Sequence, residues 1–334
     1  MRAAVGRRVR GAAGMNRIEF GDCRETMRRW AADGVKVQTC VTSPPYFGLR
    51  DYGNEGQIGL EQTPEAYIAA MVEVFCCVRD VLADDGTLWL NIGDSYSRVG
   101  GQANSQAMNG HADKHREAIR PSRGVDGCKP KDLIGIPWML AFALRADGWY
   151  LRQDIIWHKP NPMPESVRDR CTKAHEYIFL LSKSERYFFD ADAIRQPAAE
   201  SSKGKTWDER KAMGFRGDTK HPTKDAIEAG LHIPSFAPNE NGVNRRSVWT
   251  VSTKPYKGAH FATFPPDLIE PCILAGSRQG DIVLDPFMGS GTTAQVAVQH
   301  GRQYLGCELN PAYADLQRER IAGTQLDLMA GPRA

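Results

Sequence analysis

Short runs of β-branched and other apolar residues alternate along this chain with longer segments in which apolar residues recur at helical spacing. Runs of the first kind are typical of buried strands, and segments of the second kind are typical of helices with one buried face. The pattern predicts strands at residues 18–20, 35–41, 87–92, 149–157, 281–284 and 304–308. It predicts helices at residues 25–32, 63–82, 137–148, 264–276, 292–300 and 310–320.

The helix expected after Thr63 shows this pattern well. Thr63 can cap the first turn with its hydroxyl, and Pro64 suits a first-turn position because it has no amide hydrogen to leave unpaired. One face of the segment is apolar, through Tyr67, Met71, Phe75, Val78 and Leu82. We therefore expect this helix to pack against the core.

Strands and helices alternate in the order expected of a parallel sheet, in which a helix joins each strand to the next. Residues 176–181 and 187–189 are instead predicted to pair as an antiparallel hairpin at the edge of that sheet. The expected fold class is α/β: a doubly wound, mostly parallel sheet with an antiparallel edge hairpin and helices on both faces.

Two segments interrupt this alternation. Residues 98–130 are rich in Gly, Asn, Gln, His and Arg, which predicts a mobile loop, and residues 190–247 read as an insertion. The rest divides into a disordered basic leader, the two halves of the main domain and a tail, at residues 1–14, 15–189, 248–325 and 326–334. Met15 is a candidate natural start, because patterned sequence begins directly after it.

Composition excludes some classes of protein. The 334 residues are 41% hydrophobic and 25% charged, which is typical of a globular protein, and no apolar run is long enough to span a bilayer. The net charge of +3 is too small to indicate a nucleic-acid partner by itself. The eight cysteines show neither a C-x-x-C pair nor zinc-type spacing, so we expect reduced thiols, a cytoplasmic location and no metal site.

A Thr-Ser-Pro-Pro-Tyr sequence follows the strand predicted at 35–41. Two prolines fix the backbone and project their carbonyl oxygens in set directions, Ser43 adds a hydroxyl, and Tyr46 adds a flat ring. Ser43 and the carbonyl of Pro44 could accept the two hydrogens of a planar amine while its ring stacks on Tyr46. Taken alone, the segment also fits an ordinary strand-ending Pro-Pro turn with a packed tyrosine.

A glycine-rich sequence, Gly289-Ser290-Gly291-Thr292, lies between the strand predicted at 281–284 and the following helix. With Glu308 at the end of the next strand, its spacing suits either a dinucleotide or S-adenosylmethionine. Asp285 favours the second ligand, because a carboxylate at that strand end would repel a pyrophosphate and attract a cationic methionine end.

The two sequences together resemble the S-adenosylmethionine-dependent DNA amino-methyltransferases, which methylate adenine N6 or cytosine N4. Thr-Ser-Pro-Pro-Tyr is similar to their catalytic motif, and Asp-Pro-Phe-x-Gly-x-Gly-Thr to their cofactor motif. The order of the motifs matches the circularly permuted beta group. The resemblance implies a Rossmann-like methyltransferase fold and double-stranded DNA as partner, and it leaves open whether the protein forms a homodimer.

The resemblance also implies roles for particular residues. The catalytic set is Ser43, Pro44, Pro45 and Tyr46. The cofactor set is Asp22, Asp285, Phe287, Gly289, Gly291, Thr292 and Glu308, where Asp22 fits a helix N-cap equally well. The DNA-contacting set is Lys159, Asn161, Arg245 and Arg246. The basic insertion at 190–247 is then the expected recognition region, although alone it also fits a solvated surface.

Other readings share part of these motifs. An RNA or protein-glutamine methyltransferase uses a similar Pro-Pro-Tyr turn, and a non-catalytic DNA-binding regulator could use the fold. A carbon-5 cytosine methyltransferase would need a cysteine after proline at the catalytic turn, where this chain has Ser-Pro-Pro-Tyr. Serine before Pro-Pro-Tyr is commoner among cytosine-N4 enzymes of the family, which favours that base slightly and leaves adenine N6 open.

Overall fold

The computed structural model describes residues 15–49, 51, 53–97, 127–197, 242–253 and 264–330. The expectations for the leader at 1–14 and for most of 98–130 and 190–247 lie outside these residues. The described residues fall into two units, one made of the segments up to Asp190 and from Ser247 onward, the other lying within Ala191–Arg246.

The first unit contains an eight-stranded sheet in the order β1-β8-β7-β2-β3-β5-β4-β6 among the described residues. The strands are β1 (Arg17–Phe20), β2 (Val37–Thr42), β3 (Leu82–Ile92), β4 (Tyr150–His158), β5 (His175–Ser182), β6 (Val248–Thr250), β7 (Ile282–Asp285) and β8 (Gln303–Glu308). All neighbours pair in parallel except β5, which is antiparallel to both β3 and β4.

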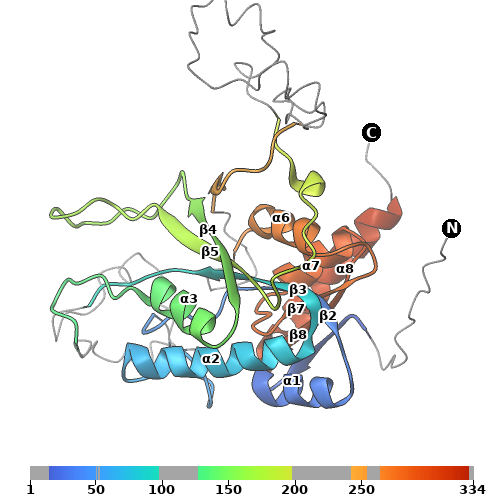
Figure 1. The fold of residues 1–334 in the computed structure, drawn as a ribbon, viewed down its shortest axis with the longest axis horizontal. Helices are drawn as coiled ribbons and strands as arrows, with labels where there is room; N and C mark the ends of the chain where they lie inside the picture. The colour runs from blue at the N-terminus through green and yellow to red at the C-terminus, as the bar shows by residue number, and fades with distance from the viewer. Residues whose placement is uncertain are drawn as a thin grey trace, which may run out of the picture. The chain divides into compact units, whose positions relative to one another are not determined.

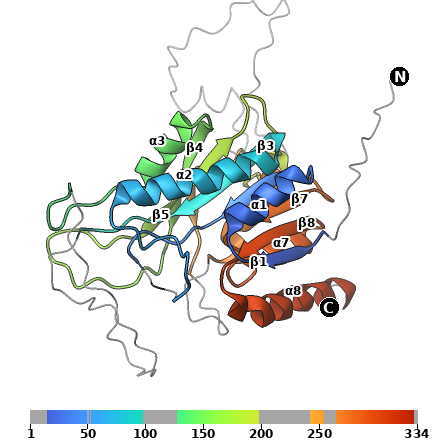
Figure 2. The same cartoon turned by 90° about the horizontal axis from the view of Figure 1, so that it is seen from below.

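Helices cover both faces of this sheet (Figures 1 and 2). One face carries α1 (Cys23–Ala32), α2 (Pro64–Val81) and α3 (Ile136–Ala146). The other carries α6 (Pro266–Gly276), α7 (Thr292–Gln299) and α8 (Ala314–Ala330), with the short 3₁₀ helix η4 (Pro311–Tyr313) before α8. A second 3₁₀ helix, η2 (Asp192–Ile194), belongs to the other unit. The predicted doubly wound α/β class is therefore confirmed.

Helix α2 forms as the sequence predicts. The Thr63 hydroxyl accepts the amide hydrogen of Ala66 at 3.2 Å, and Pro64 occupies the first turn. The predicted apolar face is fully buried, at Tyr67, Met71, Phe75 and Val78. Leu82 was expected on that face, but it takes extended backbone and is the first residue of β3.

The predicted edge hairpin is wrong in its second strand. Residues 187–189 form no strand, and β5 pairs instead with β3 and β4, while β6 lies at the edge. The Phe189 ring stacks on Trp89 with centroids 6.1 Å apart, and the amide of Phe188 donates to the carbonyl of Asp85. The aromatic run at 187–189 therefore reflects packing onto the sheet rather than strand pairing.

All eight cysteines lie among the described residues and none forms a disulfide there; their reduced state stays a prediction. Within the described part of the chain, no helix is both long and apolar enough to cross a membrane. In the same residues, no cluster of three or more His, Cys, Asp or Glu side chains could hold a metal ion.

Gly276, the last residue of α6, gives a test of packing between this helix and the sheet. A Cβ there would lie 2.7 Å from the Thr39 hydroxyl and 2.9 Å from the Trp89 indole nitrogen, both held in buried hydrogen bonds with Thr87. We expect Gly276→Ala to lower the free energy of unfolding by about 1–3 kcal/mol in urea titrations, because the neighbours must shift.

Gly323 in α8 provides the matched control, since an added Cβ meets nothing within 4 Å. Gly323→Ala should raise the free energy of unfolding by up to about 1 kcal/mol through helix propensity alone. A Gly276→Ala variant as stable as the wild type would contradict the close packing of α6 on β2 and β3.

Candidate active site

The candidate site lies where the direction of chain winding reverses. From the boundary between β7 and β2, one half of the sheet continues through β8 to β1 and the other through β3. Ligands of open α/β sheets bind at the carboxyl ends of the strands at such a point. The predicted catalytic residues follow β2 and the predicted cofactor residues follow β7, so the fold brings the two motifs together.

The Ser43–Tyr46 turn, which is the predicted catalytic turn, is held from the side of α2. The Tyr67 hydroxyl donates to the carbonyl oxygen of Pro45 at 2.9 Å, and the buried Phe47 ring lies against Tyr67 with centroids 5.6 Å apart. Pro44 is buried and Ser43 is half-buried. The backbone that presents Ser43 and Pro44 is therefore held by a core helix.

Tyr46 reaches into a small pocket at the end of β3. Its hydroxyl donates to Glu176 Oε2 at 2.7 Å, and its ring packs where Gly93 has no side chain, since a Cβ there would lie 2.7 Å from Tyr46 Cε2. Burial, and then the neighbouring Glu176 carboxylate, raise the pKa of Tyr46 well above its usual value. The phenol therefore stays protonated and acts as a donor. The pocket is lined by Tyr46, Phe47, Leu49, Gly93, Asp94, Ser95 and Ile136.

Asp285 joins the two motifs. Its carboxylate is fully buried and accepts hydrogen bonds from the Thr42 hydroxyl at 2.6 Å and the Thr293 hydroxyl at 2.7 Å. The amide of Phe287 donates to the same group at 3.0 Å. Thr42 is the residue directly before Ser43, so one carboxylate connects the catalytic turn to the start of α7. Contact between Asp285 and a bound cofactor stays a prediction.

The glycine-rich loop is held from two sides. Glu308 accepts the amide hydrogens of Gly289 at 2.7 Å and Asn310 at 2.8 Å, while the Gln317 side chain donates to the carbonyl of Gly289 at 2.7 Å. Burial raises the pKa of Glu308. The Arg320 guanidinium donates to the Ser290 hydroxyl at 2.6 Å. Gln317 and Arg320 were not predicted as site residues, because nothing in a helical repeat marks which positions face a loop.

The loop suits the cofactor that the sequence predicts. Gly289 and Gly291 have φ of 52° and 86°, a region that favours glycine, and a Cβ at Gly289 would lie beside the Phe287 carbonyl at 3.9 Å. Gly291 is the N-cap of α7 and has no side chain to cover the amides of Thr292 and the residues after it. Amides at a helix start suit a carboxylate, and Glu308 suits hydroxyl groups, so the donor and acceptor set fits S-adenosylmethionine.

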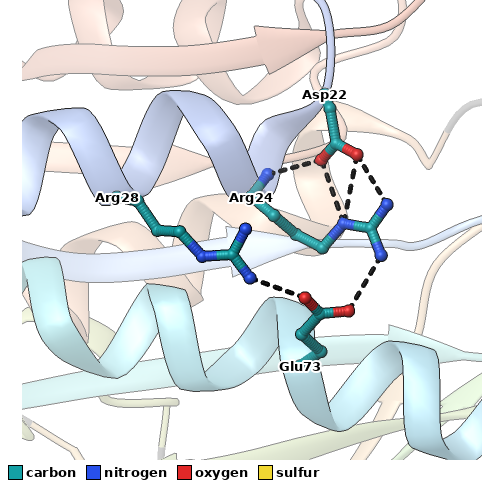
Figure 3. A network of polar contacts seen from close by, with 4 residues as sticks. All are labelled: Asp22, Arg24, Arg28 and Glu73. Atoms are coloured by element: carbon teal, nitrogen blue, oxygen red, sulfur yellow. Dashed lines mark hydrogen bonds and ion pairs between the residues drawn. The ribbon is translucent and has the colours of Figure 1, made fainter.

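Asp22 is confirmed as the N-cap of α1. Its carboxylate accepts the amide hydrogen of Arg24 at 2.7 Å, and the Arg24 side chain also contacts both carboxylate oxygens (Figure 3). These hydrogen bonds lower the pKa of Asp22. Arg24 and Arg28 both pair with Glu73 of α2, so this group links the two helices. A contact from Asp22 to the cofactor stays a prediction.

The residues predicted to contact DNA occupy two places. The Lys159 ammonium pairs with Glu176 and lies 4.3 Å from the centre of the Trp157 ring. The Asn161 side-chain amide donates to the carbonyl of Thr253 at 3.2 Å, and its oxygen accepts the amide hydrogen of Thr253 at 3.0 Å. In the other unit Arg245 is half-buried and Arg246 is exposed. DNA contact by any of the four stays a prediction.

The site combines three features at one switch point: a strand that ends in a buried carboxylate, a glycine-rich loop that leads into a helix, and a proline-rich turn. This arrangement is that of a Rossmann-like methyltransferase domain. Comparison with known proteins agrees: the family described as DNA methylase, of the N6/N4 type, matches residues 37–319. The Type II methyltransferase M.Cfr9I of Citrobacter freundii is 46% identical over 309 residues, which cover 92% of this chain and 88% of that protein.

Two solved structures share the fold. TTHA0409 of Thermus thermophilus, complexed with S-adenosyl-L-methionine, has a TM-score of 0.54 and 24% identity and covers 92% of this chain and 94% of that one. The PvuII DNA methyltransferase, described as cytosine-N4-specific, has a TM-score of 0.57 and 18% identity, with coverage of 96% and 94%.

This chain belongs to the N6/N4 DNA methylase family. It is an S-adenosylmethionine-dependent DNA methyltransferase, as the two motifs predicted. The comparisons do not favour the RNA, protein-glutamine or non-catalytic alternatives.

Asp285 gives the fold a pH dependence whose sign can be tested. Burial raises the pKa of its carboxyl from 3.8 to about 6, so the folded protein holds this proton more tightly than the unfolded chain. The stability from this group is fully present below the unfolded pKa and is lost as the pH rises through about 6. The difference in unfolding free energy between Asp285→Asn and the wild type should therefore shift in favour of the variant by up to about 3 kcal/mol as the pH rises from about 4 to about 7.

Urea titrations across this pH range measure the difference. Asp84→Asn, which removes a carboxylate that is 96% exposed, is the control for the change in net charge. If the difference between wild type and Asp285→Asn did not vary with pH, the buried carboxyl would not titrate in this range.

Proposed function

We propose that this DNA methyltransferase modifies the N4 amine of cytosine in duplex DNA, with the Ser43–Tyr46 turn as the base-binding element. The observation that carries the proposal is the Thr42–Asp285–Thr293 junction, which holds this turn beside the cofactor loop. Ser43 before Pro-Pro-Tyr favours cytosine through the family resemblance. The PvuII enzyme of the same fold is described as cytosine-N4-specific, which is compatible with this choice.

In the proposed mechanism the turn receives a base that has left the duplex. The Ser43 hydroxyl and the Pro44 carbonyl accept the two amine hydrogens, which turns the nitrogen lone pair outward, and Tyr46 holds the ring. S-adenosylmethionine supplies an electrophilic methyl group on a sulfonium centre. The new nitrogen–carbon bond forms as the sulfur–carbon bond breaks, and the amine then loses one proton to solvent. Positioning of the two reactants provides much of the rate.

The cofactor-binding part of the proposal rests on the glycine loop. Backbone amides at the start of α7, next to Gly291 and Thr292, would hold the methionine carboxylate, while Glu308 would accept the ribose hydroxyls and Phe287 would contact the adenine. Asp285 would act mainly through the loop and the turn, because its oxygens already accept three hydrogen bonds inside the protein. Lys159, Asn161, Arg245 and Arg246 would contact DNA.

The identity of the methylated base is the direct test. Purified protein, S-adenosylmethionine and plasmid DNA should yield N4-methylcytosine in digested nucleosides analysed by mass spectrometry. We expect methylation at this nitrogen because the turn offers two hydrogen-bond acceptors to an exocyclic amine. N6-methyladenine as the sole product would overturn the choice of base, and 5-methylcytosine would overturn the mechanism.

Removing the Ser43 hydroxyl should slow the reaction without affecting the cofactor. We expect Ser43→Ala to lower the single-turnover rate on the order of a hundredfold, by analogy with the loss of one positioned hydrogen-bonding group. The dissociation constant for S-adenosylmethionine, measured by calorimetry, should stay unchanged because Ser43 faces the base.

Ser184→Ala is a matched control, because that hydroxyl bonds to the carbonyl of Asp84 at the opposite end of β3. It should retain the wild-type rate. Equal rates for Ser43→Ala and Ser184→Ala would remove Ser43 from the catalytic set.

A further inference from the structure

Glu176 has a place in the site that its position in the sequence does not reveal. It lies near the start of β5, the one described strand that runs antiparallel to its neighbours. The amino end of β5 therefore reaches the same edge of the sheet as the carboxyl ends of β2, β3 and β4. The Glu176 side chain at the amino end of β5 therefore lies next to the predicted catalytic turn, which follows the carboxyl end of β2.

Three donors from three different parts of the sheet converge on this carboxylate. The Tyr46 hydroxyl, from the turn after β2, donates to Oε2 at 2.7 Å. The Asn91 amide, on β3, donates to the same oxygen at 3.4 Å. The Lys159 ammonium, directly after β4, pairs with Oε1. The Glu176 and Lys159 side chains are only 16% and 18% exposed, so solvent competes little for these contacts.

The main effect of this arrangement is geometric. Partly buried ion pairs give little net stability, because the charges lose hydration when they are enclosed. They do restrict where each side chain can lie, and here the restricted side chains are the predicted base-stacking Tyr46 and the predicted DNA contact Lys159. The Tyr46 ring is held at two points: Glu176 binds its hydroxyl, and its Cδ2–Cε2 edge lies against Gly93.

We infer that Glu176 is a positioning residue for methyl transfer: before a base enters, it orients the Tyr46 ring through the phenol and holds the Lys159 ammonium on the other oxygen of the same carboxylate. This inference rests on the proposed function, since it assigns Tyr46 to the target base. Glu176 itself touches no reacting atom. Its removal would let the Tyr46 ring turn within the pocket and leave Lys159 without its carboxylate.

The test compares Glu176→Ala, which removes both contacts, with Glu176→Gln, which keeps one oxygen for the Tyr46 hydroxyl. Single-turnover methyl transfer is measured with each variant, and rates are divided by the fraction of protein that binds S-adenosylmethionine in calorimetry. We expect Glu176→Ala to slow transfer about ten- to a hundredfold, since small misplacement of a reacting group has effects of that size. Glu176→Gln should lie between it and the wild type, and the cofactor dissociation constant should not change.

Tyr46→Phe tests whether Glu176 affects the transfer rate through the Tyr46 hydroxyl, because this substitution removes only that hydroxyl. If Glu176 acts through that hydroxyl, the double variant Tyr46→Phe with Glu176→Ala should be clearly faster than the product of the two single effects predicts. If the double variant were slowed by the full product of the two single effects, the inference would be overturned.

Glu165 supplies the control for losing a carboxylate. It pairs with Arg170, its side chain is also 16% exposed, and Tyr46 is not among its partners. Glu165→Gln should retain the wild-type rate per cofactor-binding molecule, and a Glu176→Ala variant that did the same would overturn the inference. A wild-type protein that transfers no methyl group to DNA would instead overturn the proposed function, so the two failures are distinguishable.

Discussion

The site depends on one buried carboxylate. Asp285 ends β7, and its oxygens accept hydrogen bonds from Thr42 at the end of β2 and from Thr293 in α7. Thr42 and Asp285 are 243 positions apart in the chain, yet they belong to adjacent strands. A charged or polar group in such a place is costly unless its hydrogen bonds are made, so the three donors around Asp285 have little freedom to move. The Ser43–Tyr46 turn and the glycine-rich loop consequently have one fixed relative position.

Around this junction, each remaining part of the site is supported by a neighbouring element of the fold. Tyr67 of α2 holds the Pro45 carbonyl, Gln317 of α8 holds the Gly289 carbonyl, and Glu308 holds the Gly289 amide. Glu176 of β5 accepts the hydrogen bond from the Tyr46 hydroxyl. Such supporting contacts matter in a transfer reaction whose rate comes largely from positioning, because small displacements are expensive there.

The sequence predicted the parts of the fold that depend on local patterns. The helix after Thr63 and the strands ending at Thr42 and Asp285 follow from periodicity and end signals, and the motifs at those strand ends pointed to the cofactor. Leu82 and residues 187–189 were misassigned because apolar spacing cannot distinguish a helix end from a strand start, or packing onto a sheet from pairing within it. Glu176 was missed because its role comes from the antiparallel direction of β5, which only the folded sheet reveals. Gln317 was missed for a similar reason, since its partner lies 28 positions away.

The most direct test of the junction is the methyl-transfer rate of Thr42→Val, which keeps the shape of the side chain and removes only the hydroxyl that Asp285 accepts. If the junction sets the position of the turn relative to the cofactor, single-turnover transfer should fall by about tenfold or more while the S-adenosylmethionine dissociation constant stays at the wild-type value. A Thr42→Val enzyme that transfers the methyl group at the wild-type rate would contradict the central role of the buried carboxylate.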